Sequence, residues 1–130
     1  MEQAAIPDSI DVVIAATTSK TPVYTMPARA GRLVIGVGAF TADAAEIAAE
    51  TVHASELYVD DLAGARHEAG DFILAAVDWS VVHALAEALA APGQAVDAAR
   101  PVLFKSVGCA AWDLAACGVA RALLSDESWA

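Results

Sequence analysis

Short apolar runs rich in β-branched residues alternate along this chain with alanine-rich stretches, and this alternation constrains the fold more than any other feature. Strands are predicted over residues 10–16, 33–37, 56–59 and 102–107, because each run is short, apolar and bounded by turn residues. Helices are predicted over residues 44–54, 62–70, 81–91 and 108–125. Strands that alternate with helices form βαβ units, so the sequence predicts an α/β fold with a mainly parallel sheet of about four strands.

Local signals refine these elements. The first run, Ile10 to Ala16, is apolar throughout, which predicts a strand buried on both faces. Residues 17–29 contain two prolines and are expected to form a loop. We expect Asp43 to cap the helix that follows it, and Pro92-Gly93 to end the helix over residues 81–91.

The length and charge of the chain limit what it can be. A chain of 130 residues and 13.3 kDa has room for one domain, residues 1–130, which here ends in a long helix. With 58% hydrophobic and 18% charged residues it is not a disordered chain. The net charge of −10 disfavours nucleic acid and anionic membrane surfaces as partners. We see neither a membrane-spanning run nor a signal peptide, and expect a cytoplasmic protein with reduced cysteines.

Ligands of parallel sheets bind beyond the carboxyl ends of the strands. In this chain those ends are residues 17–18, 37–40, 60–61 and 106–108. The last of them is the strongest local candidate, because Ser106-Val107-Gly108 joins a strand directly to the long helix. Backbone N–H groups at such a junction are expected to attract anions or polar groups of a ligand.

Two other strand ends allow more than one interpretation. Gly36 and Gly38 resemble part of a dinucleotide fingerprint, with Asp60 near the position of a ribose-binding acid, but the third glycine is missing and Phe40 would crowd a pyrophosphate. A tight turn on the nicotinamide or substrate side is the favoured interpretation. Asp60-Asp61 could form a metal site or an acid/base pair, but a strand-end turn with a helix N-cap is favoured. The histidines and cysteines lack ligand spacing, so no metal site is expected.

Four stretches, taken in order, resemble the ornithine cyclodeaminase/mu-crystallin family. The resemblance implies the C-terminal half of a doubly wound, Rossmann-like dinucleotide-binding domain that uses NAD(P)H. It is carried by DVVIAATTSKTPVY (residues 11–24), GVGAFTADAAEI (36–47), YVDDLAGARHEAGD (58–71) and LFKSVGCAAWDLAA (103–116).

The resemblance also implies roles for individual residues, although it identifies no catalytic residue. Thr17 would approach the nucleotide, and the cofactor-binding turn Val37-Gly38-Ala39 would lie along the nicotinamide and its ribose. Ser106 would bind the cofactor, closing over the nicotinamide with Val107. Substrate contacts would come from Phe40 and Val107. Ornithine cyclodeaminases carry an aspartate where this chain has Phe40, so the pattern is closer to the branch that reduces Δ1-pyrroline-2-carboxylate and Δ1-piperideine-2-carboxylate.

The family's glycine-rich nucleotide loop, its ribose-binding acid and the Lys and Arg that hold the substrate carboxylate precede the first matching block. The resemblance therefore implies the C-terminal portion of a cyclic ketimine reductase with a small imino or amino acid substrate. Alone, the chain is expected to bind NAD(P)H weakly or not at all, to be inactive, and to form a homo-oligomer or pair with a missing N-terminal half. The alternatives are a non-catalytic interaction module and a fragment of an ornithine cyclodeaminase, which Phe40 disfavours.

Overall fold

The computed structural model describes residues 6–90 and 99–125. Its centre is a five-stranded sheet in the order β1-β2-β5-β3-β4, in which every neighbouring pair of strands is parallel. The α/β fold and parallel sheet predicted from the alternation are therefore confirmed. The strands are β1 (Val12–Ala15), β2 (Leu33–Gly36), β3 (Glu56–Val59), β4 (Val82–Ala84) and β5 (Val102–Lys105).

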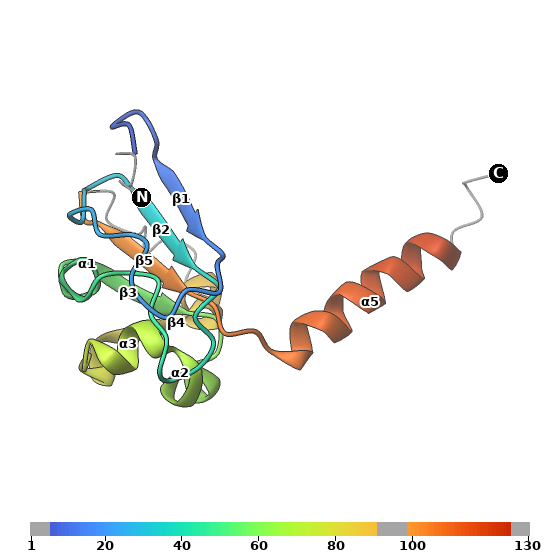
Figure 1. The fold of residues 1–130 in the computed structure, drawn as a ribbon. Coiled ribbons are helices and arrows are strands. Elements are labelled where there is room, and N and C mark those ends of the chain that lie inside the picture. Colours follow the sequence, from blue (N-terminus) through green and yellow to red (C-terminus); the bar gives the residue numbers. More distant parts are fainter. Residues whose placement is uncertain (1–5, 91–98, 126–130) are drawn as a thin grey trace.

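Short helices accompany the sheet, and one long helix leaves it. Figure 1 shows α2 and α3 together on one side of the sheet, while α5 stands away from the rest of the molecule. None of the helices in the described part of the chain is long and apolar enough to cross a membrane. The helices are α1 (Ala49–His53), α2 (Leu62–Glu68), α3 (Gly70–Leu74), a 3₁₀ turn η1 (Trp79–Val81), α4 (Leu85–Ala90) and α5 (Ala110–Ser125).

The two faces of the sheet differ in burial. On one face Val34, Leu57 and Leu103 are buried against a core that includes Phe72 of α3 and Val52 of α1. The opposite face is half-exposed along β2, β3 and β5. In β1 it is open, since Val12 and Ile14 are 52% and 63% exposed. The expectation that the first strand is buried on both faces is wrong here, because β1 is an edge strand whose open face has no cover in the described residues.

One strand that the sequence did not predict, β4, lies where a helix over residues 81–91 was expected to start. Val82, His83 and Ala84 pair in parallel with β3, and the helix begins only at Leu85. The Val81-Val82 pair favours extended backbone, whereas the run of Ala, Leu and Glu after it favours helix. The end of that predicted helix, with Pro92-Gly93, lies outside the described residues.

The helix predicted over residues 44–54 is shorter than expected, since α1 begins at Ala49. The backbone N–H groups of Glu46 and Ile47 instead donate to Asp71 Oδ1 at 2.6 and 2.8 Å, and Glu46 O accepts from the loop after β1. Hydrogen bonds from distant residues thus replace helical ones. Asp43 caps no helix. It forms an exposed ion pair with Lys20 at 2.7 Å.

The helix predicted over residues 62–70 is divided into α2 and α3. Asp61 caps α2, because its Oδ2 accepts a hydrogen bond from Gly64 N at 2.6 Å, which confirms the favoured interpretation of this acid. Gly70 starts α3 in close contact with the loop after β2. A Cβ atom on Gly70 would collide with the carbonyl oxygens of Thr41 and Ala44.

Candidate functional site

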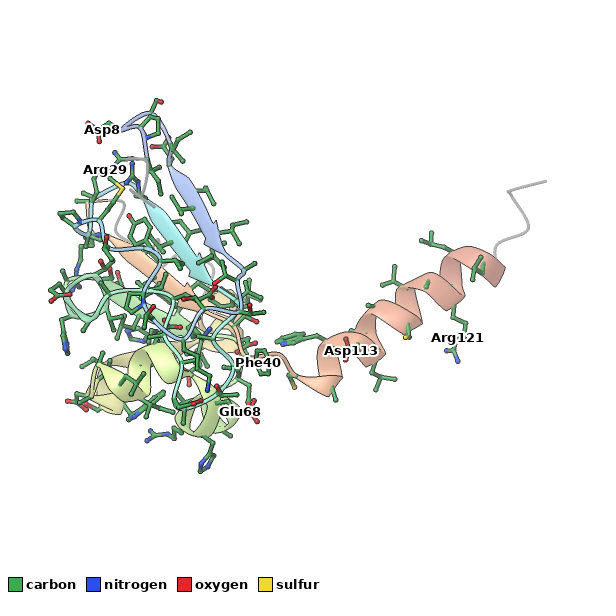
Figure 2. The ribbon with its side chains drawn as sticks, viewed as in Figure 1. Asp8, Arg29, Phe40, Glu68, Asp113 and Arg121 are labelled. Atoms are coloured by element: carbon green, nitrogen blue, oxygen red, sulfur yellow. The ribbon has the colours of Figure 1, made fainter. Side chains whose placement is uncertain are left out.

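The residues expected to contact cofactor or substrate lie at one edge of the sheet. They follow β1, β2 and β5, which are neighbours, and parallel strands share the edge at which they end. Figure 2 shows Phe40 at that end of the sheet, from which the chain also leaves toward α5. The structure thus brings to one edge Thr17, Val37, Gly38, Ala39, Phe40, Ser106 and Val107. Their individual roles stay a prediction.

Glu46, which no sequence pattern singled out, joins the ends of β1 and β2. Its side chain is fully buried. Oε1 accepts a hydrogen bond from Thr17 N at 2.5 Å, and Oε2 accepts from Gly38 N at 2.6 Å and Ala39 N at 3.2 Å. One carboxylate therefore holds the backbone of three of the five residues predicted to bind the cofactor.

Gly38 is the point of closest approach between these two strand ends. A Cβ atom at this position would collide with the Thr17 carbonyl oxygen and lie 2.6 Å from both Thr17 N and Glu46 Oε1. The second glycine of the partial fingerprint is therefore required for packing against the end of β1.

Asp60 holds the loop after β5, as Glu46 holds the ends of β1 and β2. Its Oδ2 accepts hydrogen bonds from Ser106 Oγ at 2.7 Å, Val107 N at 3.0 Å and Gly108 N at 2.8 Å. The expectation that the amides of residues 107–108 are open to an anion is not met, because both donate to Asp60. Asp60 is only 6% exposed and faces this loop, which agrees with the favoured interpretation of a strand-end turn.

A buried ion pair lies behind the edge, between β5 and α3. Lys105 Nζ is 3.2 Å from Asp71 Oδ2, at ion-pair distance but without hydrogen-bond geometry, and both side chains are fully buried. Lys105 also donates to Gly36 O at 3.3 Å. Lys105 is therefore held in the interior and does not reach the rim of the sheet. Because Asp71 Oδ1 also accepts from Glu46 N, the pair is connected to the carboxylate that holds the edge.

The two carboxylates that hold the loops are anionic at neutral pH. Burial raises the pKa of Glu46, but hydrogen bonds from Thr17, Gly38 and Ala39 more than offset it, so its pKa lies below the ordinary value. Burial likewise raises the pKa of Asp60, and the bonds from Ser106, Gly108, Asp61 and Val107 lower it further than burial raises it. Each acceptor is thus an ion held by several donors.

Two large apolar side chains are accessible at this edge. Phe40 is 60% exposed and Val37 is 42% exposed, beside the exposed Thr17. The nearby cations Lys20 and Lys105 are each paired with a carboxylate. The edge can therefore seat a flat, uncharged group against backbone that is held from beneath. Phosphate binding needs free amides or cations, and the amides of Thr17, Gly38, Ala39, Val107 and Gly108 are already occupied by Glu46 and Asp60.

The fold and the edge define a class: part of a parallel, Rossmann-like sheet whose ligand edge lies at the strand ends. A sequence model of the ornithine cyclodeaminase/mu-crystallin family matches residues 2–127. The chain belongs to this family.

Relatives of known name are much longer than this chain. It is 67% identical over 121 residues to a Delta(1)-pyrroline-2-carboxylate/Delta(1)-piperideine-2-carboxylate reductase of Azospirillum brasilense, a match that covers 93% of this chain and 38% of that protein. The chain thus spans little more than a third of that curated relative.

Two solved structures share the fold. A probable ornithine cyclodeaminase of Bordetella pertussis Tohama I matches with a TM-score of 0.78 and 28% identity, over 90% of this chain and 40% of its own. The Delta(1)-pyrroline-2-carboxylate reductase of Thermococcus litoralis, solved with NADH and L-proline, matches with a TM-score of 0.69 and 34% identity, over 78% of this chain and 33% of its own.

Proposed function

We propose that this chain is the C-terminal portion of an NAD(P)H-dependent reductase of Δ1-pyrroline-2-carboxylate and Δ1-piperideine-2-carboxylate. The Azospirillum relative, 67% identical, bears that activity in its name, which supports the proposal. Because the match covers 38% of that protein, we place the pyrophosphate loop and the cations for the substrate carboxylate in the rest of the whole protein. A cytoplasmic location is also proposed. The free thiols of Cys109 and Cys117 and the net charge of −10 support it.

The observation that carries the proposal is the character of the edge formed by the ends of β1, β2 and β5. Its amides at Thr17, Gly38, Ala39, Val107 and Gly108 are occupied by Glu46 and Asp60, while apolar side chains stay exposed. These features fit the nicotinamide end of the cofactor and do not fit its pyrophosphate.

Within this assignment, the chain's own residues seat the reactants. The bound nicotinamide supplies the hydride. Thr17, Gly38 and Ala39 present a fixed backbone to the cofactor, and Val37 excludes water beside it. Phe40 and Val107 face the substrate, with Ser106 closing over the nicotinamide. Phe40 has no atom that accepts a proton, so this position orients the substrate without exchanging a proton with it.

Two alternatives predict different behaviour. An ornithine cyclodeaminase would use an acid at position 40 for the substrate amine, and Phe40 offers none. A non-catalytic interaction module is favoured only by the open sheet face and by the exposed helix α5. Restoring the missing part of the enzyme distinguishes these alternatives, because only a reductase portion gains reductase activity.

The isolated chain of 130 residues is expected to show no NADPH or NADH oxidation with Δ1-pyrroline-2-carboxylate. The reason is that the amides of Thr17, Gly38, Ala39, Val107 and Gly108 already donate to Glu46 or Asp60, while Lys20 and Lys105 are each paired with a carboxylate, so none of these groups is available to the pyrophosphate. The chain is then joined behind the region of the Azospirillum relative that it does not match, and this joined protein is expected to recover turnover. Loss of absorbance at 340 nm measures both.

The control is the Azospirillum region alone, which should be inactive. Turnover by the isolated chain near the enzyme median of about 10 s⁻¹ would contradict our placing of the pyrophosphate site elsewhere. A folded but inactive joined protein would favour the interaction module. Ammonia release from ornithine by the joined protein would favour the cyclodeaminase.

We also propose that the chain pairs with the missing N-terminal region or, without it, with copies of itself. β1 is an open edge with Val12 and Ile14 exposed, and Leu114 and Leu124 of α5 are 76% and 87% exposed. Such edges and apolar surfaces recruit partners. Sedimentation at micromolar concentration is expected to give a dimer or larger species. A compact monomer of 13.3 kDa that melts cooperatively would overturn this proposal.

A further inference from the structure

We propose that Glu46 is a positioning residue, whose carboxylate sets the relative placement of the β1 and β2 ends on which the nicotinamide sits. This inference rests on the proposed function above. It assigns to Glu46 no contact with cofactor or substrate. The role acts through the backbone of Thr17, Gly38 and Ala39, which the carboxylate holds.

The carboxylate is divided between two segments of chain. Oε1 serves the end of β1 through Thr17, and Oε2 serves the end of β2 through Gly38 and Ala39. The two segments are in tight contact, because Gly38 lies too close to Thr17 for a Cβ atom. A shift of this carboxylate therefore moves the two segments relative to each other, while the packing of the apolar core beneath them is unchanged.

Glu46 is itself fixed on both sides of its backbone. Its N–H donates to Asp71 Oδ1 at 2.6 Å, and its carbonyl oxygen accepts from Val23 N and Tyr24 N, each at 2.8 Å. Asp71 in turn lies 3.2 Å from Lys105 Nζ on β5. The carboxylate thus reaches the edge from a backbone that β5, α3 and the loop after β1 hold in place.

Conservative variants separate this role from general stability. Glu46→Gln keeps the size of the side chain but replaces one acceptor oxygen by an NH₂ group, which faces an amide donor. Glu46→Asp keeps the charge but is one methylene shorter, so it cannot serve both segments. Because a 1 Å misplacement can lower the rate about 10²-fold, we expect the joined protein to lose about that factor in kcat. The KM for the cofactor should change little, since the pyrophosphate is held elsewhere.

The first arm of the test uses the full chain of 130 residues. Scalar couplings across hydrogen bonds, from the amide nitrogens of Thr17 and Gly38 to the Glu46 side-chain carboxyl carbon, are expected in the unsubstituted protein. In Glu46→Gln, hydrogen exchange should accelerate at these two amides and not in β3 and β5. The matched control is Glu50→Gln, which replaces an exposed glutamate in α1. This variant should change neither the couplings nor the hydrogen exchange at Thr17 and Gly38.

The second arm compares kcat and KM of the joined protein and its variants, per folded molecule, with Glu50→Gln again unchanged and Glu46→Asp intermediate. Missing couplings in the unsubstituted chain would overturn the inference, even if every variant failed to fold. It would also be overturned by uniform acceleration of exchange across the sheet, or by an unchanged kcat in folded Glu46→Gln. An inactive parent joined protein would instead contradict the proposed function, and the couplings and exchange would then decide this inference alone.

Discussion

Replacing Asp71 with alanine is expected to lower the free energy of unfolding by about 3–5 kcal/mol, because removing one partner of a buried ion pair leaves the other charge uncompensated. Lys105 would keep only the Gly36 carbonyl oxygen, at 3.3 Å, in a fully buried position. Glu46 N and Ile47 N would lose their shared acceptor as well. Urea denaturation of the isolated chain measures the change, which is a large share of the roughly 5–15 kcal/mol typical of a domain.

Two further variants check the cause. Asp43→Ala removes an exposed carboxylate that is also paired with a lysine. It should lower the free energy of unfolding far less than Asp71→Ala does, because solvent screens the exposed pair. Adding Lys105→Met to Asp71→Ala removes the unpaired charge and should restore part of the loss. If Asp71→Ala lowers stability no more than Asp43→Ala does, the pair is not buried as described. No recovery in the double variant would assign the loss to the two amides.

The strands were predictable where local composition and tertiary packing agree. Residues 56–59 form β3 with the predicted bounds, since this run is short and flanked by turn residues. The stretch from residue 44 to 48 was not predictable, because alanine and glutamate favour helix locally. There the acceptor Asp71, 25 residues from Glu46, overrides that preference. The three residues of β4 are too few to show a strand period.

The location of the candidate site follows from topology, but the groups that shape it do not. Parallel strands end at a common edge, so Thr17, Gly38 and Ser106 could be placed together from the sequence. The hydrogen bonds that Glu46 and Asp60 accept could not be predicted from the sequence. Their backbone donors lie as far as 29 and 48 residues away, so they leave no local pattern. One signal was present. Glu46 stands in an otherwise apolar run, where a buried carboxylate must find donors.

Gly38→Ala tests the close approach on which this edge depends. The added methyl group would collide with the Thr17 carbonyl oxygen, and the obstacle is backbone that cannot rotate away. Overpacking commonly lowers the free energy of unfolding by about 1–3 kcal/mol and occasionally by more. We expect the loss in Gly38→Ala to reach or exceed the upper end of this range. Urea denaturation measures the loss, and faster hydrogen exchange at Thr17 shows where the structure opens, since Glu46 would then be displaced from its donors.

Gly36→Ala is the matched control, two residues earlier in the same segment. A Cβ atom there would meet its nearest neighbours, Ile47 and Lys105, at 3.5 Å, which is ordinary van der Waals contact. Gly36→Ala should therefore lower the free energy of unfolding far less than Gly38→Ala does. Hydrogen exchange at the Thr17 amide should stay slow in the Gly36→Ala variant. If the two alanine variants are equally stable, the ends of β1 and β2 do not approach as described. The backbone of the proposed nicotinamide seat would then lack the support that Glu46 and Gly38 together provide.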